Sequence, residues 1–180
     1  MRARSFIKSV TSLCLFIFVQ LAAAKPPQSR CDYPPDLHDE ISRKYPDTSL
    51  VSLADLSEYS RKLFQKEHGN RCPGLVRVNF YGDARPTWAL LLVEKKAAER
   101  KAQLVVARQI GKDWETRLLQ VADAAPVPVI WREGPGTYEG MSEPMKILAQ
   151  NPVVILCGYG SWSILYAWTG KDVVKLQITD

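Results

Sequence analysis

The sequence has few of the residues from which metal sites and nucleophilic catalytic sites are usually built. It holds only two histidines, His38 and His68, and four cysteines, no two of which are spaced as C-x-x-C. Structural zinc sites need several Cys or His ligands at short spacings, so this pattern excludes a zinc site of that kind. We predict no metal, no cofactor and no catalytic residue, and we expect a protein that is not an enzyme.

The distribution of charged and apolar residues excludes two classes of partner. The net charge of the chain is +5, but its lysines and arginines form no stripe interleaved with aromatic residues, as a nucleic-acid-binding surface would require. Beyond the N-terminus, no apolar stretch reaches the roughly 20 residues of a membrane-spanning helix. We therefore predict no nucleic-acid partner and no stable membrane insertion of the mature chain.

The first 24 residues have the order of features that signal peptidase reads. Three basic residues lie among the first eight, an apolar run extends from Val10 to Leu21, and Ala22-Ala23-Ala24 supplies small residues before Lys25. The alternative is a membrane anchor, for which the run of about a dozen residues is short. We predict that residues 1–24 are a cleaved signal peptide. Its removal takes away three basic residues and no acidic ones, which lowers the net charge from +5 to +2.

Three cysteines remain in the predicted mature chain: Cys31, Cys72 and Cys157. Cys31 and Cys72 lie in polar segments that flank a helical region, whereas Cys157 ends an apolar run. Because exported proteins fold under oxidising conditions, we predict a disulfide between Cys31 and Cys72 and one spare thiol. On the chain-entropy model, closing that loop stabilises the fold by roughly 4 kcal/mol.

The mature chain divides into an arm and one domain. Residues 25–51 are predicted to be a proline-rich arm with a short helix, and residues 52–180 a single α+β domain. Apolar residues at helical spacing predict an amphipathic helix from Leu53 to His68, with Ser52 and Asp55 close to a capping box. Gly69 is expected to end this helix.

After Pro73 the apolar pattern changes to that of strands, with short links between them. Short links favour antiparallel neighbours, because parallel pairs need long crossovers. We therefore predict an α+β fold in which the N-terminal amphipathic helix packs on an antiparallel β-meander of about seven or eight strands. The expected strands are 76–80, 87–94, 103–110, 114–121, 127–132, 153–157, 163–168 and 173–178.

The segment N-F-Y-G-D-A-R-P-T-W-A-L-L-L, residues 79–92, resembles a known calcium-loop hairpin. Exported bacterial domains with an FG-GAP-like loop carry D-x-N-G-D-G-x-x-D-x-A-L-L-L there, and the run S-I-L-Y-A-W-T-G-K-D-V-V-K-L, residues 163–176, extends the resemblance loosely. Here Asn79, Tyr81 and Thr87 replace three oxygen ligands, so that Asp83 is the only carboxylate left. The resemblance implies an exported β-rich domain with a metal-free turn, and it implies no defined activity.

Two glycine-rich segments are candidate partner-binding loops. Gly158–Trp162 carries Tyr159 and Trp162, and the polar segment 134–140 carries Tyr138 and Glu139. Tyrosine and tryptophan are common at binding hot spots, and loops often carry function. The alternatives are a hairpin with its aromatic residues in the core and a plain connection. The predicted partner-binding residues are Trp131, Tyr138, Glu139, Tyr159 and Trp162.

Taken together, these features predict an exported, periplasmic or secreted, non-catalytic binding protein whose partner is another protein. An inhibitor or an immunity protein directed against a toxin or a hydrolase fits this description. Two alternatives remain open. One is a periplasmic hydrolase of unrecognised type that uses Glu139 or Asp83 as acid or base, and the other is a component of envelope assembly.

Overall fold

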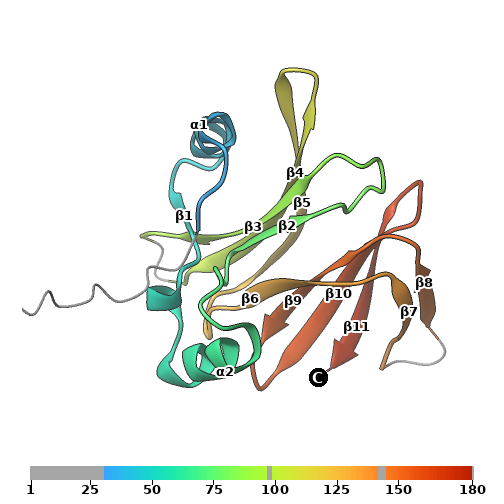
Figure 1. The fold of residues 1–180 in the computed structure, drawn as a ribbon. Coiled ribbons are helices and arrows are strands. Elements are labelled where there is room, and N and C mark those ends of the chain that lie inside the picture. The colour runs from blue at the N-terminus through green and yellow to red at the C-terminus, as the bar shows by residue number, and fades with distance from the viewer. Residues whose placement is uncertain (1–30, 97–98, 142–144, 180) are drawn as a thin grey trace, which may run out of the picture.

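The computed structural model describes residues 31–96, 99–141 and 145–179. The predicted signal peptide, residues 1–24, and the start of the predicted arm, residues 25–30, lie outside the described residues. In the described part, two antiparallel sheets are stacked on each other, with α1 beside the first sheet and α2 near one end of the second (Figure 1).

The first sheet is built around the apolar strand β3. Its other strands join β3 or β4 by antiparallel pairing, and β1 and β2 share one edge of β3. The expected strands 76–80 and 87–94 pair as the β2–β3 hairpin, and the expected strands 103–110 and 114–121 pair as the β4–β5 hairpin, both antiparallel as predicted. The strands are β1 (Thr48–Leu50), β2 (Leu75–Val78), β3 (Thr87–Glu94), β4 (Lys101–Ile110) and β5 (Asp113–Asp123).

The second sheet has the order β11-β10-β9-β6, again with antiparallel pairing. The three strands expected near the C-terminus are present, and β6 lies at an edge of the sheet, directly after Pro126 and Pro128, which sheets tolerate mainly at edges. A separate ribbon, β7 paired with β8, follows β6. The strands are β6 (Val129–Glu133), β7 (Gly136–Glu139), β8 (Lys146–Ala149), β9 (Val153–Gly158), β10 (Trp162–Trp168) and β11 (Val173–Thr179).

The main core lies between the two sheets. Alternate residues of β3 and β4, such as Leu91 and Leu104, pack in one buried cluster with Leu156 of β9 and Tyr166 of β10. The opposite face of the first sheet, including Leu90, packs with apolar residues of α1 (Pro35–Lys44). Because successive side chains of a strand point to opposite faces, β3 is buried on both sides, which explains its nearly continuous apolar sequence.

The helix predicted from Leu53 to His68 is interrupted in the structure. Leu53–Asp55 forms one 3-10 turn, Leu56 is extended, and α2 runs from Glu58 to His68. The predicted Ser52–Asp55 capping contact is present, with Ser52 N donating to Asp55 Oδ2 at 2.9 Å. The reason for the break is a second cap: the Ser57 hydroxyl accepts a hydrogen bond from Ser60 N at 3.1 Å and starts a new helix there.

The predicted meander was correct in its antiparallel pairing but not in its layout. The described residues form eleven strands, divided between two sheets and one ribbon, and the short helix predicted within residues 25–51 is present as α1, which packs on the first sheet. Part of segment 134–140, predicted as a loop, is strand β7, because β8 supplies its backbone hydrogen-bond partners. A sheet of eleven strands would expose apolar faces, which stacking two sheets buries.

Candidate functional site

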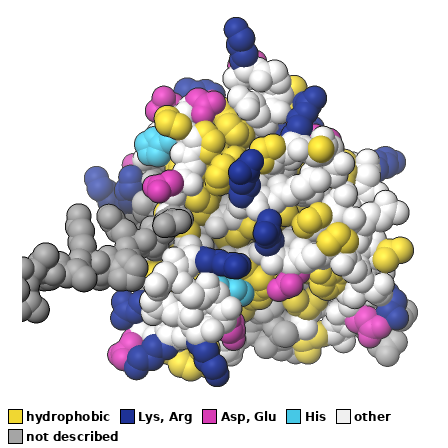
Figure 2. Space-filling model, viewed as in Figure 1, with side chains coloured by type: hydrophobic (Ala, Val, Ile, Leu, Met, Phe, Trp, Pro, Cys, Tyr) yellow, Lys and Arg dark blue, Asp and Glu magenta, His cyan; other side chains and the backbone are white. Residues whose placement is uncertain are grey.

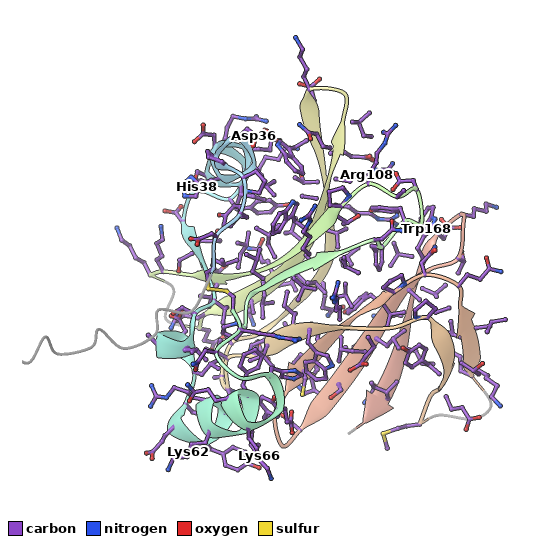
Figure 3. All side chains as sticks on the ribbon, viewed as in Figure 1. Asp36, His38, Lys62, Lys66, Arg108 and Trp168 are labelled. Carbon is purple, nitrogen blue, oxygen red and sulfur yellow. A yellow bond between two sulfur atoms is a disulfide. The ribbon has the colours of Figure 1, made fainter. Side chains whose placement is uncertain are left out.

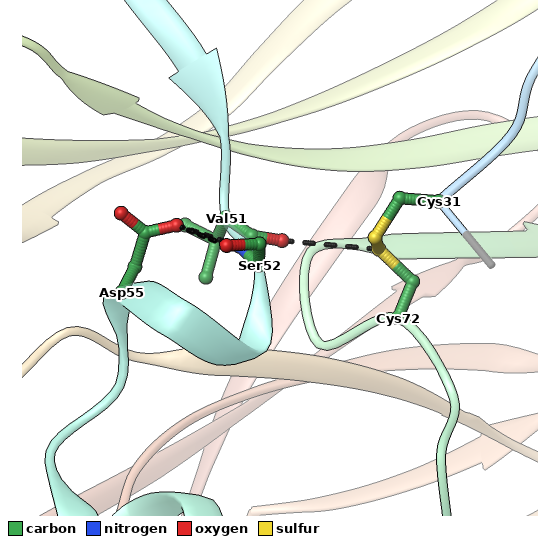
Figure 4. Close-up of a disulfide and its surroundings, with 5 residues drawn as sticks. All are labelled: Cys31, Val51, Ser52, Asp55 and Cys72. Carbon is green, nitrogen blue, oxygen red and sulfur yellow. Dashed lines mark hydrogen bonds between the residues drawn. A yellow bond between two sulfur atoms is a disulfide. The ribbon is translucent and has the colours of Figure 1, made fainter. Parts of the chain in front are cut away.

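The base of the candidate site is fixed by the disulfide that the sequence predicted. Cys31 and Cys72 are bridged, and this ties the segment before α1 to the residues before β2 (Figure 4). Cys72 Sγ lies 3.8 Å from Val51 O. At Gly74 a Cβ atom would lie only 2.4 Å from Val51 O, so a side chain there would force the backbone apart. The chain at residues 72–74 is therefore held firmly where β2 begins.

A cleft of about 840 Å³ opens along β2 and the edge strand β6. The two strands meet where Ile130 N donates to Pro73 O at 2.8 Å. Farther along, Arg132 reaches the backbone of β2 only through its side chain, with Nη1 donating to Arg77 O at 3.4 Å. The cleft is lined by residues of both strands and of the segments that precede and follow β2.

Three arginines give the cleft its charge. Arg71 precedes β2, Arg77 lies in β2 and Arg132 lies in β6. Among the described residues, none of the three forms an ion pair, and Asp32 is the only carboxylate among the residues that line the cleft. Figure 2 shows Lys and Arg side chains following one another across the middle of this face, with hydrophobic side chains between them. The cleft therefore carries excess positive charge.

Aromatic rings form part of the cleft walls. The Arg77 guanidinium lies over the Trp88 ring at 5.8 Å from its centroid. His68, at the end of α2, packs between Phe64 at 4.9 Å and Trp131 at 5.0 Å, measured between ring centroids. Arginine and tryptophan side by side present both charge and a flat apolar surface, and both residue types are enriched at binding hot spots.

His68 serves packing rather than proton transfer. Burial lowers the pKa of its imidazole, and the nearby Arg71 lowers it further against the opposing effect of Glu67 and Glu133. His68 Nε2 is buried and has no hydrogen-bond partner among the described residues. The Glu67 carboxylate is 3.8 Å away, which is too far for a hydrogen bond. The ring is therefore neutral at neutral pH and acts as part of an aromatic stack.

Of the predicted partner-binding residues, Trp131 lines the cleft, and its Nε1 donates to Glu133 Oε1 at 2.9 Å. Tyr159 lies in the turn between β9 and β10, where its hydroxyl donates to Glu67 Oε2 of α2 at 2.9 Å. Burial and this hydrogen bond raise the pKa of Tyr159. Trp162 packs its indole ring closely against Gly158. The turn therefore holds α2 in place beside the cleft.

The other two predicted residues lie on the β7–β8 ribbon. The Tyr138 hydroxyl donates to Gly134 O at 2.6 Å, and Glu139 pairs with Lys146 of β8 at 2.6 Å. Neither residue lines the cleft. The structure thus brings Trp131 into the cleft, bonds Tyr159 to Glu67 of α2, and packs Trp162 against Gly158. It leaves Tyr138 and Glu139 on a separate element.

The sequence analysis did not identify the three cleft arginines. Arg77 alternates with Val76 and Val78, which is what any strand with one exposed face shows. Arg132 is 55 residues farther along the chain, and only the meeting of β2 with β6 brings it to Arg77. No local signal connects the two residues, because the contact between these strands depends on how the sheets stack.

The segment that resembles a calcium loop forms the β2–β3 turn. Asp83 Oδ1 accepts a hydrogen bond from Arg85 N at 3.1 Å, so this carboxylate stabilises its own turn. Tyr81 is held from two sides: Arg108 of β4 lies 4.4 Å from its ring centroid, and Trp168 of β10 packs edge-on at 5.1 Å (Figure 3). These contacts hold the turn against β4 of the first sheet and β10 of the second.

No family model matches the chain, and comparison with curated proteins and with solved structures gave no match. Within residues 31–96, 99–141 and 145–179, no three His, Cys, Asp or Glu side chains are grouped so that they could hold a metal ion. In the same part of the chain, no helix is long and apolar enough to cross a membrane.

Proposed function

We propose that this protein is an exported, non-catalytic binding protein that holds an acidic partner protein in the cleft between β2 and β6. The observation that carries the proposal is the grouping of Arg71, Arg77 and Arg132, without ion pairs among the described residues, around one open cleft. Unpaired positive charge on a concave surface attracts a negatively charged partner and guides its orientation.

The composition of the cleft favours a protein partner. An exposed ion pair contributes only about 1 kcal/mol or less, so charge alone gives weak binding. Trp88 and Trp131 add apolar surface beside the arginines, and burying such rings supplies affinity that the charges do not. An inhibitor or immunity protein works in this way, by covering an acidic surface of a toxin or hydrolase.

The disulfide supports a site of action outside the cytoplasm. Structural disulfides persist in oxidising compartments and are rare where thiols are kept reduced. Cys31–Cys72 joins the two segments at the base of the cleft, so an oxidising environment also preserves the proposed binding surface.

The hydrolase alternative has less support from local contacts. Glu139 is held in an ion pair with Lys146, and Asp83 closes its own turn, so both carboxylates already have structural roles. The envelope-assembly alternative differs in its expected location, because such a component would co-purify with membrane fractions.

The test is differential capture from a periplasmic extract of the source cells. The mature protein, a variant carrying Arg77→Glu and Arg132→Glu, and a control carrying Lys112→Glu and Lys171→Glu are immobilised and the retained proteins quantified by mass spectrometry. The control changes the net charge by the same amount as the cleft variant. Lys112 and Lys171 are exposed in turns outside the cleft, so the control leaves the cleft itself unchanged.

We expect wild type and control to retain the same acidic protein and the cleft variant to retain at least tenfold less of it. Equal retention by all three proteins, or no acidic protein retained by wild type, would contradict the proposal. Circular dichroism checks that the three proteins have the same secondary structure, so that any difference in retention comes from the charge changes and not from unfolding.

A further inference from the structure

Strand β5 forms one edge of the first sheet, and its outer side has no neighbouring strand among the described residues. It pairs with β4 along its whole length, and no other described element runs alongside it. None of its eleven residues is buried. Figure 1 shows the tip of the β4–β5 hairpin projecting beyond the second sheet. The outer edge of β5 therefore has room for a further strand.

The first half of β5 directs unpaired backbone groups to this outer edge. A two-residue turn connects Ile110 to Asp113, and its hydrogen bond directs Asp113 N toward β4. Because this direction alternates along a strand, the N–H and C=O groups of Trp114, Thr116 and Leu118 point outward. The register with β4 shifts directly after Leu118, at a bulge, so the regular part of the edge ends there.

One face of this edge is partly apolar and incompletely covered. It is the face on which α1 lies, where Trp114 Nε1 donates to Asp36 Oδ2 at 2.9 Å and Lys44 Nζ donates to Thr116 Oγ1 at 3.0 Å. Leu118 lies on the same face and is 46% exposed. Sheet edges are commonly protected from other strands by lysine or proline, and this stretch of β5 contains neither. The edge is thus open to pairing and has apolar surface to bury.

The opposite face of the same stretch carries one acidic and one basic side chain. Glu115 pairs with Arg108 of β4 at 2.7 Å, and about half of its side chain remains exposed. Arg117 is exposed and forms no ion pair among the described residues. A carboxylate and a guanidinium two residues apart on one face are complementary to the same two groups in an antiparallel strand.

We propose that two copies of this chain associate by antiparallel pairing of β5 with β5, centred on Thr116. In this register the outward backbone groups of the two copies face each other. Trp114 lies opposite Leu118 of the second copy and covers its exposed side chain. Glu115 lies opposite Arg117 of the second copy, and the twofold axis repeats both contacts.

Charge selects this register over its neighbours. Centring the pair on Glu115 or on Arg117 would place that residue opposite itself. Centring it on Trp114 would bring Asp113 opposite Glu115. Like charges directly opposite each other in a sheet are destabilising. Centres farther along β5 run into the bulge, so Thr116 is the centre at which the regular part of the strand is complementary to itself.

The dimer leaves the cleft open. β2 lies beside β3 on the side away from β4 and β5, so a second copy paired with β5 does not cover it. Each copy keeps its own cleft, and the dimer has two of them. The inference therefore does not depend on what the cleft binds.

The first experiment measures the mass of the mature protein by sedimentation velocity over a hundredfold range of concentration, because the population of a dimer rises with concentration. We expect a monomer–dimer equilibrium in wild type. Arg117→Glu places a carboxylate opposite Glu115 of the second copy and should weaken association at least tenfold. The matched control is Lys171→Glu, which makes the same charge change in the exposed turn between β10 and β11 and should associate as wild type does.

The second experiment tests the register by oxidative cross-linking of single-cysteine variants. Opposite residues of a hydrogen-bonded antiparallel pair have Cα atoms about 5.5 Å apart, which suits a disulfide, so Thr116→Cys should yield covalent dimers. Leu118→Cys is the control: it is more exposed than Thr116, yet its counterpart in the second copy lies roughly 13 Å away along the strands. We expect at least tenfold more covalent dimer from Thr116→Cys, measured on non-reducing gels.

Three results would overturn the inference. The first is a wild-type protein that stays monomeric over the whole concentration range. The second is Arg117→Glu associating as tightly as Lys171→Glu, which would place any dimer contact away from β5. The third is cross-linking of Leu118→Cys as efficient as that of Thr116→Cys, which would mean random collision or a different register.

Discussion

At the scale of single residues, the candidate site depends on side chains whose chemistry is altered by what surrounds them. The His68 imidazole lies between Phe64 and Trp131, and burial lowers its pKa. Burial likewise raises the pKa of the Cys157 thiol, which is free, so this cysteine stays protonated in the fold. Both groups are therefore uncharged at neutral pH.

Because the pKa of His68 is lowered in the folded protein, the free energy of unfolding depends on pH. The folded state binds a proton at this site less readily than the unfolded chain, whose histidines titrate near pH 6.5. Lowering the pH through that range therefore favours the unfolded chain and decreases the free energy of unfolding. We expect His68→Phe to reduce this decrease between pH 7 and pH 5, as measured by urea denaturation at each pH.

The control for this measurement is His38→Phe, since His38 is exposed on α1 and its replacement leaves the surroundings of His68 unchanged. The quantity compared is the slope of the free energy of unfolding against pH. The difference in this slope between wild type and His68→Phe separates the contribution of His68 from that of carboxylates that titrate in the same pH range. Identical slopes for wild type and His68→Phe would show that the imidazole is not desolvated as described.

At the scale of elements, the site depends on how β2 is anchored. The Cys31–Cys72 bridge and the close approach of Gly74 to Val51 fix the start of this strand, and its far end turns into β3 at residues 79–86. The sequence predicted the bridge, because Cys31 and Cys72 lie in polar segments and Cys157 ends an apolar strand. It did not predict the break before α2, where the Ser57 cap outweighed the helical periodicity.

Removing the bridge should cost about 4 kcal/mol of stability, because it frees a loop spanning 41 residues in the unfolded chain. We expect Cys31→Ser, Cys72→Ser and the double variant to lose the same amount, since each change breaks the same bond. Urea denaturation without reductant measures the three losses. A double variant that loses the sum of the two single losses would mean that the cysteines act independently.

At the scale of the whole molecule, the stacking of two sheets creates the cleft. Contact between β2 and β6 exists only because the sheets pack face to face, and Tyr166 contributes to this packing. The Tyr166 ring is buried in the core between the sheets, and its hydroxyl donates to Gln120 Oε1 of β5 at 3.1 Å. One residue thus connects β10 with the edge strand of the other sheet.

We expect Tyr166→Ala to lower the free energy of unfolding by about 3–5 kcal/mol, because it leaves a cavity between the sheets. Tyr166→Phe keeps the ring and loses one hydrogen bond, so it should cost about 1 kcal/mol. Chemical denaturation measures both values.

The control for these variants is Tyr59→Ala. Tyr59 is exposed on α2, so its loss should change stability by no more than about 0.5 kcal/mol. If Tyr166→Ala cost as little as Tyr59→Ala, the ring would not belong to the core between the sheets.

The sequence by itself determined the local features of this protein. Antiparallel hairpins followed from strands with short links, and the disulfide followed from the polar setting of Cys31 and Cys72. These features depend on neighbours in the chain, whose preferences periodicity and turn residues record.

Only the tertiary structure decided that the strands divide into two stacked sheets and that Arg77 and Arg132 face one cleft. The physical reason is that burial of apolar faces sets how the sheets pack, while the arginines remain at their solvent-exposed edges. Residues distant in the sequence then become neighbours as a consequence of packing. The local sequence around Arg77 therefore does not predict that Arg132 lies beside it, and the local sequence around Arg132 does not predict Arg77.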